Sequence, residues 1–445
     1  MGEKRMQLLK GYLNVRALSI LIFSFILAGC AGTNEEASNS KDSGEKSGQT
    51  TIEFVYWAAA GGEEKGFNDL VAEFEEQNPD IKVKKSQVPP PNQGDYYTKL
   101  QTRMGGNDSP DVFRVQYQKI GEFASKGALL DLTDILEKDK DKFNSSLLTA
   151  VTYEGKIYGL PHHTDTLAVF YNKTYLDELG IKAPETLEDA WTWEELSDIA
   201  KKIKEKGLAP NGLASNTSAS SAYRTLPFFF QNGASLLTDD LKKSNVTTPE
   251  AIETLTYLQT MYTNYMSKGN SMKGSDDATM LFTSGNAGLL INGNWMIPKF
   301  ESDMKDYEWG VTYMPVKEAA ASDLGGNGLA IPENSKQADA AKKFVTFMGE
   351  KENMKKFVEQ GLFLPGRTDV TGPFKYAIEK PEMMELFIEQ SQTVPENLAK
   401  TVTTPEFSKI NQALGDSIEE LYTQGKSPEA VAKELEEKIN DILAE

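Results

Sequence analysis

The stretch IEFVYWAAAGGEEKGFNDLVAEFEEQNPDIKVKKSQV, residues 52–88, decides the fold class of this chain. Residues 52–57 form an apolar run typical of a buried strand, and a segment with apolar residues at helical spacing follows a small-residue turn. Residues 81–88 predict a second strand. A helix over 96–104 and a third strand over 111–115 come next. This alternation of strand and helix predicts an α/β fold with parallel strands covered by helices.

The rest of the chain continues the alternation and is too long for one hydrophobic core. A length of 445 residues suggests two domains or one large composite fold. Short strands are predicted over 166–171, 288–291 and 309–313, with helical patterns between them. Two helices with apolar spacing are predicted within 405–445. Because ligands of such sheets bind beyond the carboxyl ends of the strands, side chains that directly follow strands are the first candidates for a binding site.

The N-terminus has the pattern of a secretory signal. Residues 1–29 combine a basic start, an apolar run over 18–27 and small residues before Cys30. The apolar run is shorter than the roughly 20 residues that a membrane-spanning helix needs, so a retained helix is the weaker alternative. The ending resembles the lipobox of bacterial lipoproteins, in which the cysteine is acylated and becomes the mature N-terminus; a free structural thiol is the other alternative. Residues 30–50 are polar and predict a flexible tether.

Composition excludes several classes of partner. The chain carries 47 Lys and Arg against 66 Asp and Glu, a net charge of −19, which repels nucleic acid and anionic lipid headgroups but says little about a neutral ligand. Cys30 is the single cysteine, so its acylation would leave no disulfide and no thiolate metal site. The two histidines, His162 and His163, are adjacent, and neighbours in an extended segment point to opposite faces. We therefore expect no shared metal.

Four segments together resemble the extracellular solute-binding proteins of ABC importers, the family that includes maltose-binding protein. They occur in the family's order over residues 52–350. The segments are IEFVYW with its helix ending QNPDIKV; SPDVFRVQ with FASKGALLDLT; IYGLPHHTDTLAVFYNKTYLDELG with TWEEL; and AGLLINGNWMIP with GGNGLAIPENSKQADAAKKFVTFM.

The resemblance implies a two-lobed, periplasmic-binding-protein-like α/β fold with a ligand cleft between the lobes and three interlobe crossings. Closure around ligand would then be a hinge motion of a few connecting residues. The crossings are expected near 161–165, 325–329 and 363–367. The expected limits are 51–162 and 328–363 for lobe 1, and 165–325 and 367–445 for lobe 2.

A sugar ligand would need aromatic rings for its C–H faces and paired polar groups for its hydroxyls. By likeness to the family, Trp295 is expected to stack on a sugar ring, although a core Trp beside a helix is the alternative. Asp165 is expected to accept hydrogen bonds from sugar hydroxyls, with a turn or capping role as its alternative. Tyr223 is expected as a second stacking residue. Its neighbour Arg224 stands where the family has an aromatic residue, which leaves the number of stacked rings open.

The remaining candidates follow the predicted strands or lie at the crossings. Trp57 either touches the ligand or only supports the site. Glu63 and Glu64 open the first predicted helix, where carboxylates favour the positive end of the dipole, so ligand binding is the weaker reading for them. The other expected ligand contacts are Gln116, Asn294, His163, Asn327 and Arg367. A solvated loop is the alternative for the first of these, and hinge stabilisation for the last two.

The leading hypothesis is a lipid-anchored substrate-binding protein that captures a carbohydrate, expected to be an oligosaccharide, and delivers it to the permease subunits of an ABC transporter. It needs no catalysis, cofactor or metal. We expect a monomer that touches the membrane only through the lipid on Cys30, at the extracellular face of the cytoplasmic membrane. A receptor in a cell without an outer membrane would otherwise diffuse away, which favours a Gram-positive type of envelope.

Two alternatives remain open. A secreted polysaccharide-active hydrolase would need a pair of carboxylates flanking the scissile bond, and no motif singles out such a pair. Neither a Gly-x-Ser-x-Gly nor a His-Glu-x-x-His run occurs. An importer receptor for another polar ligand, such as a polyamine or an iron complex, would need clustered acidic groups or clustered Tyr and His.

Overall fold

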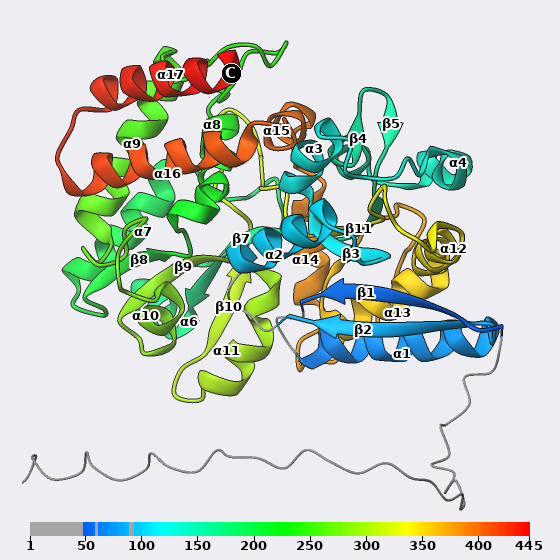
Figure 1. Cartoon of the computed structure of the whole chain (residues 1–445). Coiled ribbons are helices and arrows are strands. Elements are labelled where there is room, and N and C mark those ends of the chain that lie inside the picture. Colours follow the sequence, from blue (N-terminus) through cyan, green and yellow to red (C-terminus); the bar gives the residue numbers. More distant parts are fainter. Residues whose placement is uncertain (1–47, 58–60, 89–92) are drawn as a thin grey trace, which may run out of the picture. The chain divides into compact units, whose positions relative to one another are not determined.

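The computed structural model describes residues 48–57, 61–88 and 93–445, which contain two main β-sheets with their helices (Figure 1). The predicted signal peptide, the lipobox at Cys30 and the tether as far as residue 47 lie outside the described residues. Within the described part, none of the helices combines the length and the apolar character that a membrane span requires.

The first sheet contains the three strands predicted from the opening stretch. As predicted, β1 (Thr50–Tyr56) pairs in parallel with β2 (Ile81–Gln87) and with β3 (Val112–Gln116). β1 and β2 run side by side in Figure 1. The other three strands pair in antiparallel fashion, so the sheet is mixed rather than purely parallel. In order across the sheet the strands are β12 (Leu364–Pro365), β6 (Leu160–Thr164), β11 (Asn327–Ala330), β3 (Val112–Gln116), β1 (Thr50–Tyr56) and β2 (Ile81–Gln87).

The helices associated with this sheet pack their apolar faces on a buried core rich in Phe and Tyr. They are α1 (Gly61–Gln77), α2 (Gln93–Gly105), α3 (Tyr117–Ser125), α4 (Thr133–Leu136), η1 (Glu137–Lys142), α5 (Ser145–Ala150), α12 (Ala338–Met348) and α13 (Lys351–Gly361). A two-stranded hairpin, β4 (Thr152–Tyr153) with β5 (Lys156–Ile157), turns at Glu154 and Gly155, both of which have a positive φ.

The second sheet has four strands, in the order β10 (Trp309–Thr312), β7 (Leu167–Asn172), β9 (Ala287–Gly293) and β8 (Asn211–Ser215). The helix α7 (Trp193–Glu205), which precedes β8 in the chain, starts at a capping box. In it the Thr192 hydroxyl accepts from the Glu195 N–H and the Glu195 carboxylate accepts from the Thr192 N–H. The helices associated with this sheet are α6 (Lys173–Leu179), α7 (Trp193–Glu205), η2 (Ala219–Thr225), α8 (Leu226–Gln231), α9 (Pro249–Tyr265), α10 (Ala278–Thr283), η3 (Asn294–Met296), α11 (Ile297–Asp303) and α14 (Met383–Ser391).

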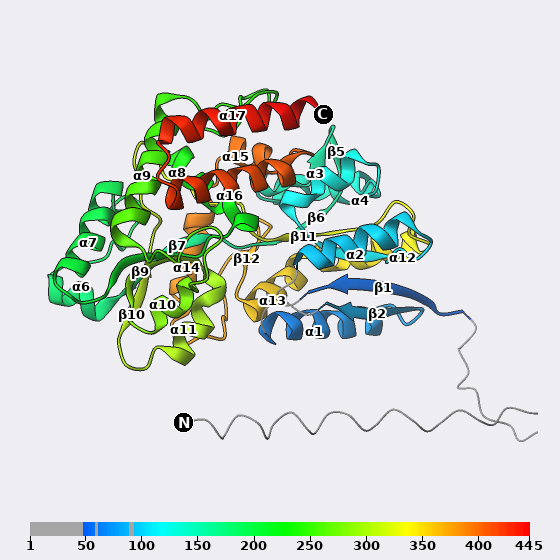
Figure 2. The ribbon, with the colours of Figure 1, turned by 60° about the vertical axis from the view of Figure 1, so that its left-hand side comes forward.

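The chain passes between the two sheets more than once. It leaves β6 and enters β7 through only two residues, Asp165 and Thr166, and it returns between β10 and β11. After β12, which extends the first sheet, α14 packs against β7. Two long C-terminal helices, α16 (Phe407–Thr423) and α17 (Pro428–Ala444), lie side by side next to α9 (Figure 2). In the chain, α15 (Glu396–Val402) lies between α14 and α16. It packs on α5, a helix associated with the first sheet, although we expect residues 367–445 in lobe 2.

Two glycines allow the second connection to run directly against the first. A Cβ atom on Gly325 would lie 2.0 Å from Oδ1 of Asp165, so a larger residue has no room there. Gly326 has a φ of +89°, and a Cβ on it would lie 2.3 Å from the carbonyl oxygen of His163. The two connections are therefore in contact at the point where the sheets join.

Candidate functional site

Five side chains gather where the two connections meet. We name them the junction cluster: Asp165, Tyr223, Arg224, Trp295 and Asp323. Arg224 is at the centre, with its Cζ 4.4 Å from the ring centroid of Trp295 and 5.4 Å from that of Tyr223. Its Nη1 lies 3.7 Å from Oδ2 of Asp323. The cluster brings together the aromatic and acidic residues that the sequence predicts for sugar binding.

Three polar atoms of the junction cluster are buried without a hydrogen-bond partner. They are Oδ1 of Asp165, Nη1 of Arg224 and Oδ2 of Asp323. The separation of 3.7 Å between the last two permits an ion pair but is too long for a hydrogen bond. The second oxygen of Asp323 is used structurally, because Oδ1 accepts the N–H of Leu167 at 3.0 Å. Buried polar atoms are normally paired, so the three atoms make the junction cluster a candidate site.

Burial controls the ionisation of this cluster. It raises the pKa of Asp323 to about 6, against the opposing effect of Arg224. Burial also raises the pKa of Asp165, although Arg224 and Arg114 oppose it. Burial lowers the pKa of Arg224, but the neighbouring Tyr223, Asp323 and Asp165 outweigh this effect and hold the pKa above its usual value. The cluster therefore places one permanent cation between two carboxyl groups.

A second group of side chains surrounds Arg114 on β3. Nη1 of Arg114 lies 2.5 Å from both Oε1 of Glu63 and the carbonyl oxygen of Trp57. Nη2 lies 3.3 Å from Nε2 of His163, and the guanidinium carbon lies 4.3 Å from the ring centroid of Trp57. Trp57, Glu63, Arg114, His163 and Asn327 form what we name the β3 cluster. Because the charge of Arg114 acts on Asp165, the two clusters belong to one electrostatic environment.

The two histidines do not point to opposite faces, so that prediction is wrong. Their Nδ1 atoms lie only 3.1 Å apart. The pairing of β6 with β11 shifts register here: Asn327 pairs with His163 but Gly328 pairs with Pro161, which leaves His162 as an extra residue in a bulge. Burial and a nearby guanidinium lower the pKa of His162 to about 3 and that of His163 well below its usual value, so both rings are neutral at pH 7. Among the described residues, no group of three or more His, Cys, Asp or Glu is arranged to hold a metal ion.

Two more predicted residues lie beside the β3 cluster or within it. Nδ2 of Asn327 lies 3.3 Å from Nε2 of His163, and its buried Oδ1 has no hydrogen-bond partner. Gln116 is the last residue of β3 and pairs with Asn327 in the sheet. Its backbone N–H donates to the hydroxyl of Tyr97 at 2.8 Å, while its half-buried side chain remains accessible.

The structure does not bring Asn294 and Arg367 to the junction cluster. Both polar ends of Asn294 bond to backbone: Oδ1 accepts the N–H of Thr166 at 3.1 Å, and Nδ2 donates to the carbonyl of Leu362 at 2.7 Å. Arg367 donates from Nε and Nη2 to the two oxygens of Asp369, each at 2.8 Å, and from Nη1 to a backbone carbonyl. Both side chains hold connecting segments in place.

Comparison with known proteins identifies the family. The model of the family "Bacterial extracellular solute-binding protein" matches residues 60–355 of the chain. The chain belongs to this family. Membership of a solute-binding family agrees with the expectation that the chain is not an enzyme.

This solute-binding protein is similar to the arabinooligosaccharide-binding protein of Bacillus subtilis, at 28% identity over 368 residues that cover 79% of each chain. It is also similar to the maltodextrin-binding protein MdxE of the same organism, at 24% identity over 440 residues, or 97% of this chain and 98% of that protein. A solved ABC substrate-binding protein from Listeria monocytogenes, in complex with cycloalternan, has a TM-score of 0.75 and 28% identity and covers 89% of this chain and 99% of its own. The solved structures confirm the predicted periplasmic-binding-protein-like α/β fold.

Sequence reasoning assigned no ligand role to Arg114 or Asp323, and for Glu63 ligand binding was only the weaker reading. Arg224 of this solute-binding protein was noted only as a departure from the family. One signal was available for Arg114, because a charged residue inside the apolar strand segment VFRV needs a buried partner. Asp323 precedes the Gly325-Gly326 pair, but nothing in the local pattern marks it as buried. Only the tertiary structure places Arg224 on the ring of Trp295.

A C-terminal helix fixes the segment that carries Tyr223 and Arg224. Oδ1 of Asn411, on α16, accepts the N–H of Tyr223 at 2.7 Å. Its Nδ2 donates to the carbonyl of Ser220 at 2.9 Å. Asn411 thus holds both ends of one turn of η2, and α16 contributes to the site although it lies beyond residues 52–350, the segments that carry the resemblance.

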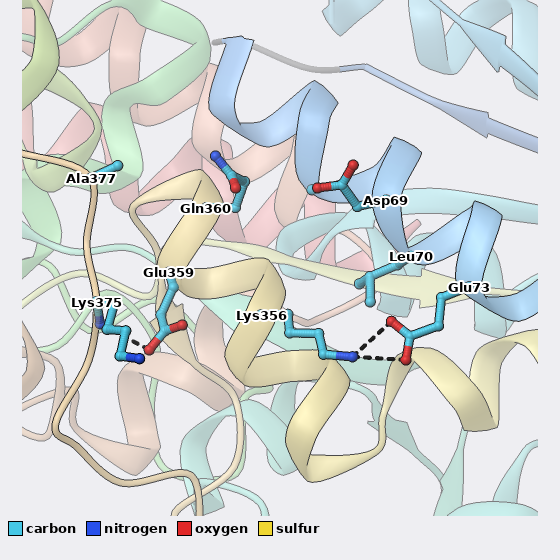
Figure 3. Close-up of a pocket in the computed structure, with 9 residues that line it drawn as sticks. Asp69, Leu70, Glu73, Lys356, Glu359, Gln360, Lys375 and Ala377 are labelled. Carbon is cyan, nitrogen blue, oxygen red and sulfur yellow. Dashed lines mark hydrogen bonds and ion pairs between the residues drawn. The ribbon is translucent and has the colours of Figure 1, made fainter.

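A separate pocket of about 250 Å³ lies between α1 and α13 (Figure 3). None of the predicted ligand-binding residues lines it. Nζ of Lys356 donates to both oxygens of Glu73 at 2.7 and 2.8 Å, and Oε1 of Glu359 accepts the backbone N–H of Lys375 at 2.8 Å. The unpartnered buried atoms described above belong to the two clusters and not to this pocket.

Proposed function

We propose that this protein is the substrate-binding component of an ABC importer, which captures an oligosaccharide by hinge closure and delivers it to the permease subunits. Family membership supports the transport role. The relatives named for arabinooligosaccharides and maltodextrin, and the solved relative in complex with cycloalternan, support a carbohydrate ligand.

The arrangement of unpartnered atoms in the junction cluster carries this proposal. Two buried carboxylate oxygens, from Asp165 and Asp323, need donors, and one guanidinium N–H, from Arg224, needs an acceptor. A hydroxyl group can donate to a carboxylate and accept from a guanidinium at the same time. An acidic ligand would face the two carboxylates, and a cationic ligand would face Arg224. A neutral ligand with several hydroxyls satisfies all three atoms, and a carbohydrate is such a ligand.

We propose two sides for the ligand site. Trp295, Asp165 and Tyr223 contribute from the junction cluster. The residues proposed on the other side are Trp57, Gln116, His163 and Asn327. The contribution proposed for Asn294 and Arg367 is indirect, because their polar groups bond to the connecting segments.

A panel of neutral oligosaccharides tests the proposal by thermal shift and titration calorimetry. A ligand that binds only the native state raises the melting temperature by mass action, so at least one arabino- or malto-oligosaccharide is expected to stabilise the protein. Replacement of Asp165 by Asn should abolish most of that shift. Release of reducing sugar from the panel, or no shift with any of its members, would contradict the proposal.

We also propose that the mature protein is a monomer anchored through acylated Cys30 at the outer face of the cytoplasmic membrane of a cell with a Gram-positive type of envelope. The lipobox-like sequence before Cys30 and the polar tether after it support the anchor. Cys30→Ala is expected to move the protein from the membrane fraction to the medium while its sugar binding stays unchanged. Retention of the variant on the membrane would exclude the lipid as the anchor.

A further inference from the structure

Two groups of the protein itself lie against the ring of Trp295. The guanidinium of Arg224 lies over this ring, with its Cζ 4.4 Å from the centroid. The backbone of Gly293 also lies against the indole, since a Cβ built on it would be 1.9, 2.2 and 2.4 Å from three successive ring carbons. Such similar distances place Gly293 over the plane of the ring rather than at its edge. The indole, which is half-buried, therefore already packs against a guanidinium and a backbone segment of the protein.

Arg224 is held so that one donor remains free for a ligand. Its guanidinium packs on the rings of Trp295 and Tyr223, which favours a flat, fixed orientation. Its Nη1 is buried without a hydrogen-bond partner and lies 3.7 Å from Oδ2 of Asp323, which is also unpartnered. A hydroxyl oxygen placed beside this pair, off the line that joins the two atoms, lies within hydrogen-bond distance of both and can accept from one and donate to the other.

We propose that Arg224 is the specificity-determining residue of the site: its guanidinium contacts the ligand, and Trp295 is a positioning residue that holds it. This inference rests on the proposed sugar-binding function. It replaces aromatic stacking at Trp295 with a hydroxyl bridge between Arg224 and Asp323. The site then selects a ligand by the placement of one hydroxyl group rather than by an exposed apolar ring face.

Stacking and positioning predict opposite results when Arg224 is removed. If the sugar stacks on Trp295, removal of the guanidinium uncovers the ring, and affinity stays the same or improves. If the guanidinium contacts the ligand, its loss removes a charged hydrogen bond and weakens binding about 10- to 100-fold. In a chain that already lacks Arg224, Trp295→Ala should then reduce ligand affinity only slightly further, because a positioning residue acts only through its partner.

Titration calorimetry of the full chain with maltotriose and with arabinotriose tests the inference as a double-mutant cycle. The variants are Arg224→Gln, Trp295→Ala and the combination, with Arg224→Ala as a second removal of the charge. Trp295→Phe keeps an aromatic ring beneath the guanidinium and should restore most of the affinity that Trp295→Ala loses. The matched control is Arg103→Gln, since Arg103 pairs with Glu53 outside both clusters and should not affect the Kd.

The inference predicts that Arg224→Gln, Arg224→Ala and Trp295→Ala each weaken binding at least tenfold. The combination of Arg224→Gln and Trp295→Ala should be no more than about threefold weaker than Arg224→Gln alone. Unchanged or tighter binding by both Arg224 variants would overturn it, as would fully additive losses. If the wild-type chain binds neither sugar, the result contradicts the proposed function for these sugars and, with it, the inference about Arg224. If the wild type binds and the Arg224 variants bind equally well, only the inference fails.

Discussion

Nη1 of Arg224 lies 3.7 Å from Oδ2 of Asp323, and both atoms are buried without a hydrogen-bond partner. The two residues come from different parts of the chain: Arg224 from η2, and Asp323 from the connection between β10 and β11. Desolvation of such a pair is costly unless other groups complete its hydrogen bonds. A ligand hydroxyl that completes these hydrogen bonds removes the desolvation penalty of the pair, and this contributes to the free energy of ligand binding.

Ligand affinity should fall at acidic pH. Burial raises the pKa of Asp323 to about 6, and only the ionised carboxylate accepts a hydroxyl hydrogen bond strongly. Affinity is therefore expected to be full above pH 7 and to drop up to about tenfold at pH 5, one unit below that pKa. Calorimetry at pH 5.0 and 7.5 measures the effect. Asp323→Asn should bind more weakly and with a much flatter pH profile, the residual slope coming from Asp165; an unchanged profile would exclude Asp323 as the titrating group.

Ionisation of Asp323 should also make the stability of the ligand-free protein depend on pH. This dependence has the opposite sign, because stability falls as the pH rises whereas ligand affinity increases. Because the pKa of Asp323 is higher in the folded protein than its ordinary value of 3.8, the folded state binds this proton more tightly than the unfolded chain does. Its contribution to stability is thus full below about pH 4 and is lost as the pH rises to about 6. Melting curves of wild type and Asp323→Asn across this range isolate the contribution. The wild type should lose stability relative to the variant as the pH rises; parallel curves would contradict the shifted pKa.

Local patterns predicted the framework of the fold well. The β1 to β3 region depends on residues close together in sequence, and periodicity identifies such features. The histidine pair was misread because the bulge at His162 depends on the pairing of β6 with β11, which no local pattern shows. Likewise, Arg224 reaches Trp295 only because both segments are placed by the second sheet and by Asn411 of α16.

The buried ion pair between Arg114 and Glu63 should be essential for stability. Both side chains are at most 3% exposed, so Arg114→Met removes the cation from a buried carboxylate. The expected loss in the free energy of unfolding is about 3–5 kcal/mol, measured by urea denaturation. Lys65→Met is the matched control, because the pair of Lys65 and Asp69 is more than half exposed and should contribute less than about 1 kcal/mol. Equal losses in the two variants would contradict the assigned role of Arg114.

The contact between the two connections should not tolerate a side chain at position 325. Gly325→Ala would place a Cβ 2.0 Å from Oδ1 of Asp165 and force that carboxylate to move. We expect a loss of about 1–3 kcal/mol in stability together with weaker sugar binding, measured by denaturation and calorimetry. Gly105→Ala, at the end of α2 with no atom within 4 Å of the added Cβ, should leave both properties nearly unchanged. Normal sugar binding by Gly325→Ala would show that the position of Asp165 is not critical.

A crystal structure of the protein with a bound oligosaccharide tests the central claim most directly. The account predicts a ligand hydroxyl oxygen within hydrogen-bond distance of both Nη1 of Arg224 and Oδ2 of Asp323, and a second hydroxyl donating to Oδ1 of Asp165. A sugar bound away from these three atoms, with the junction cluster unchanged, would contradict it.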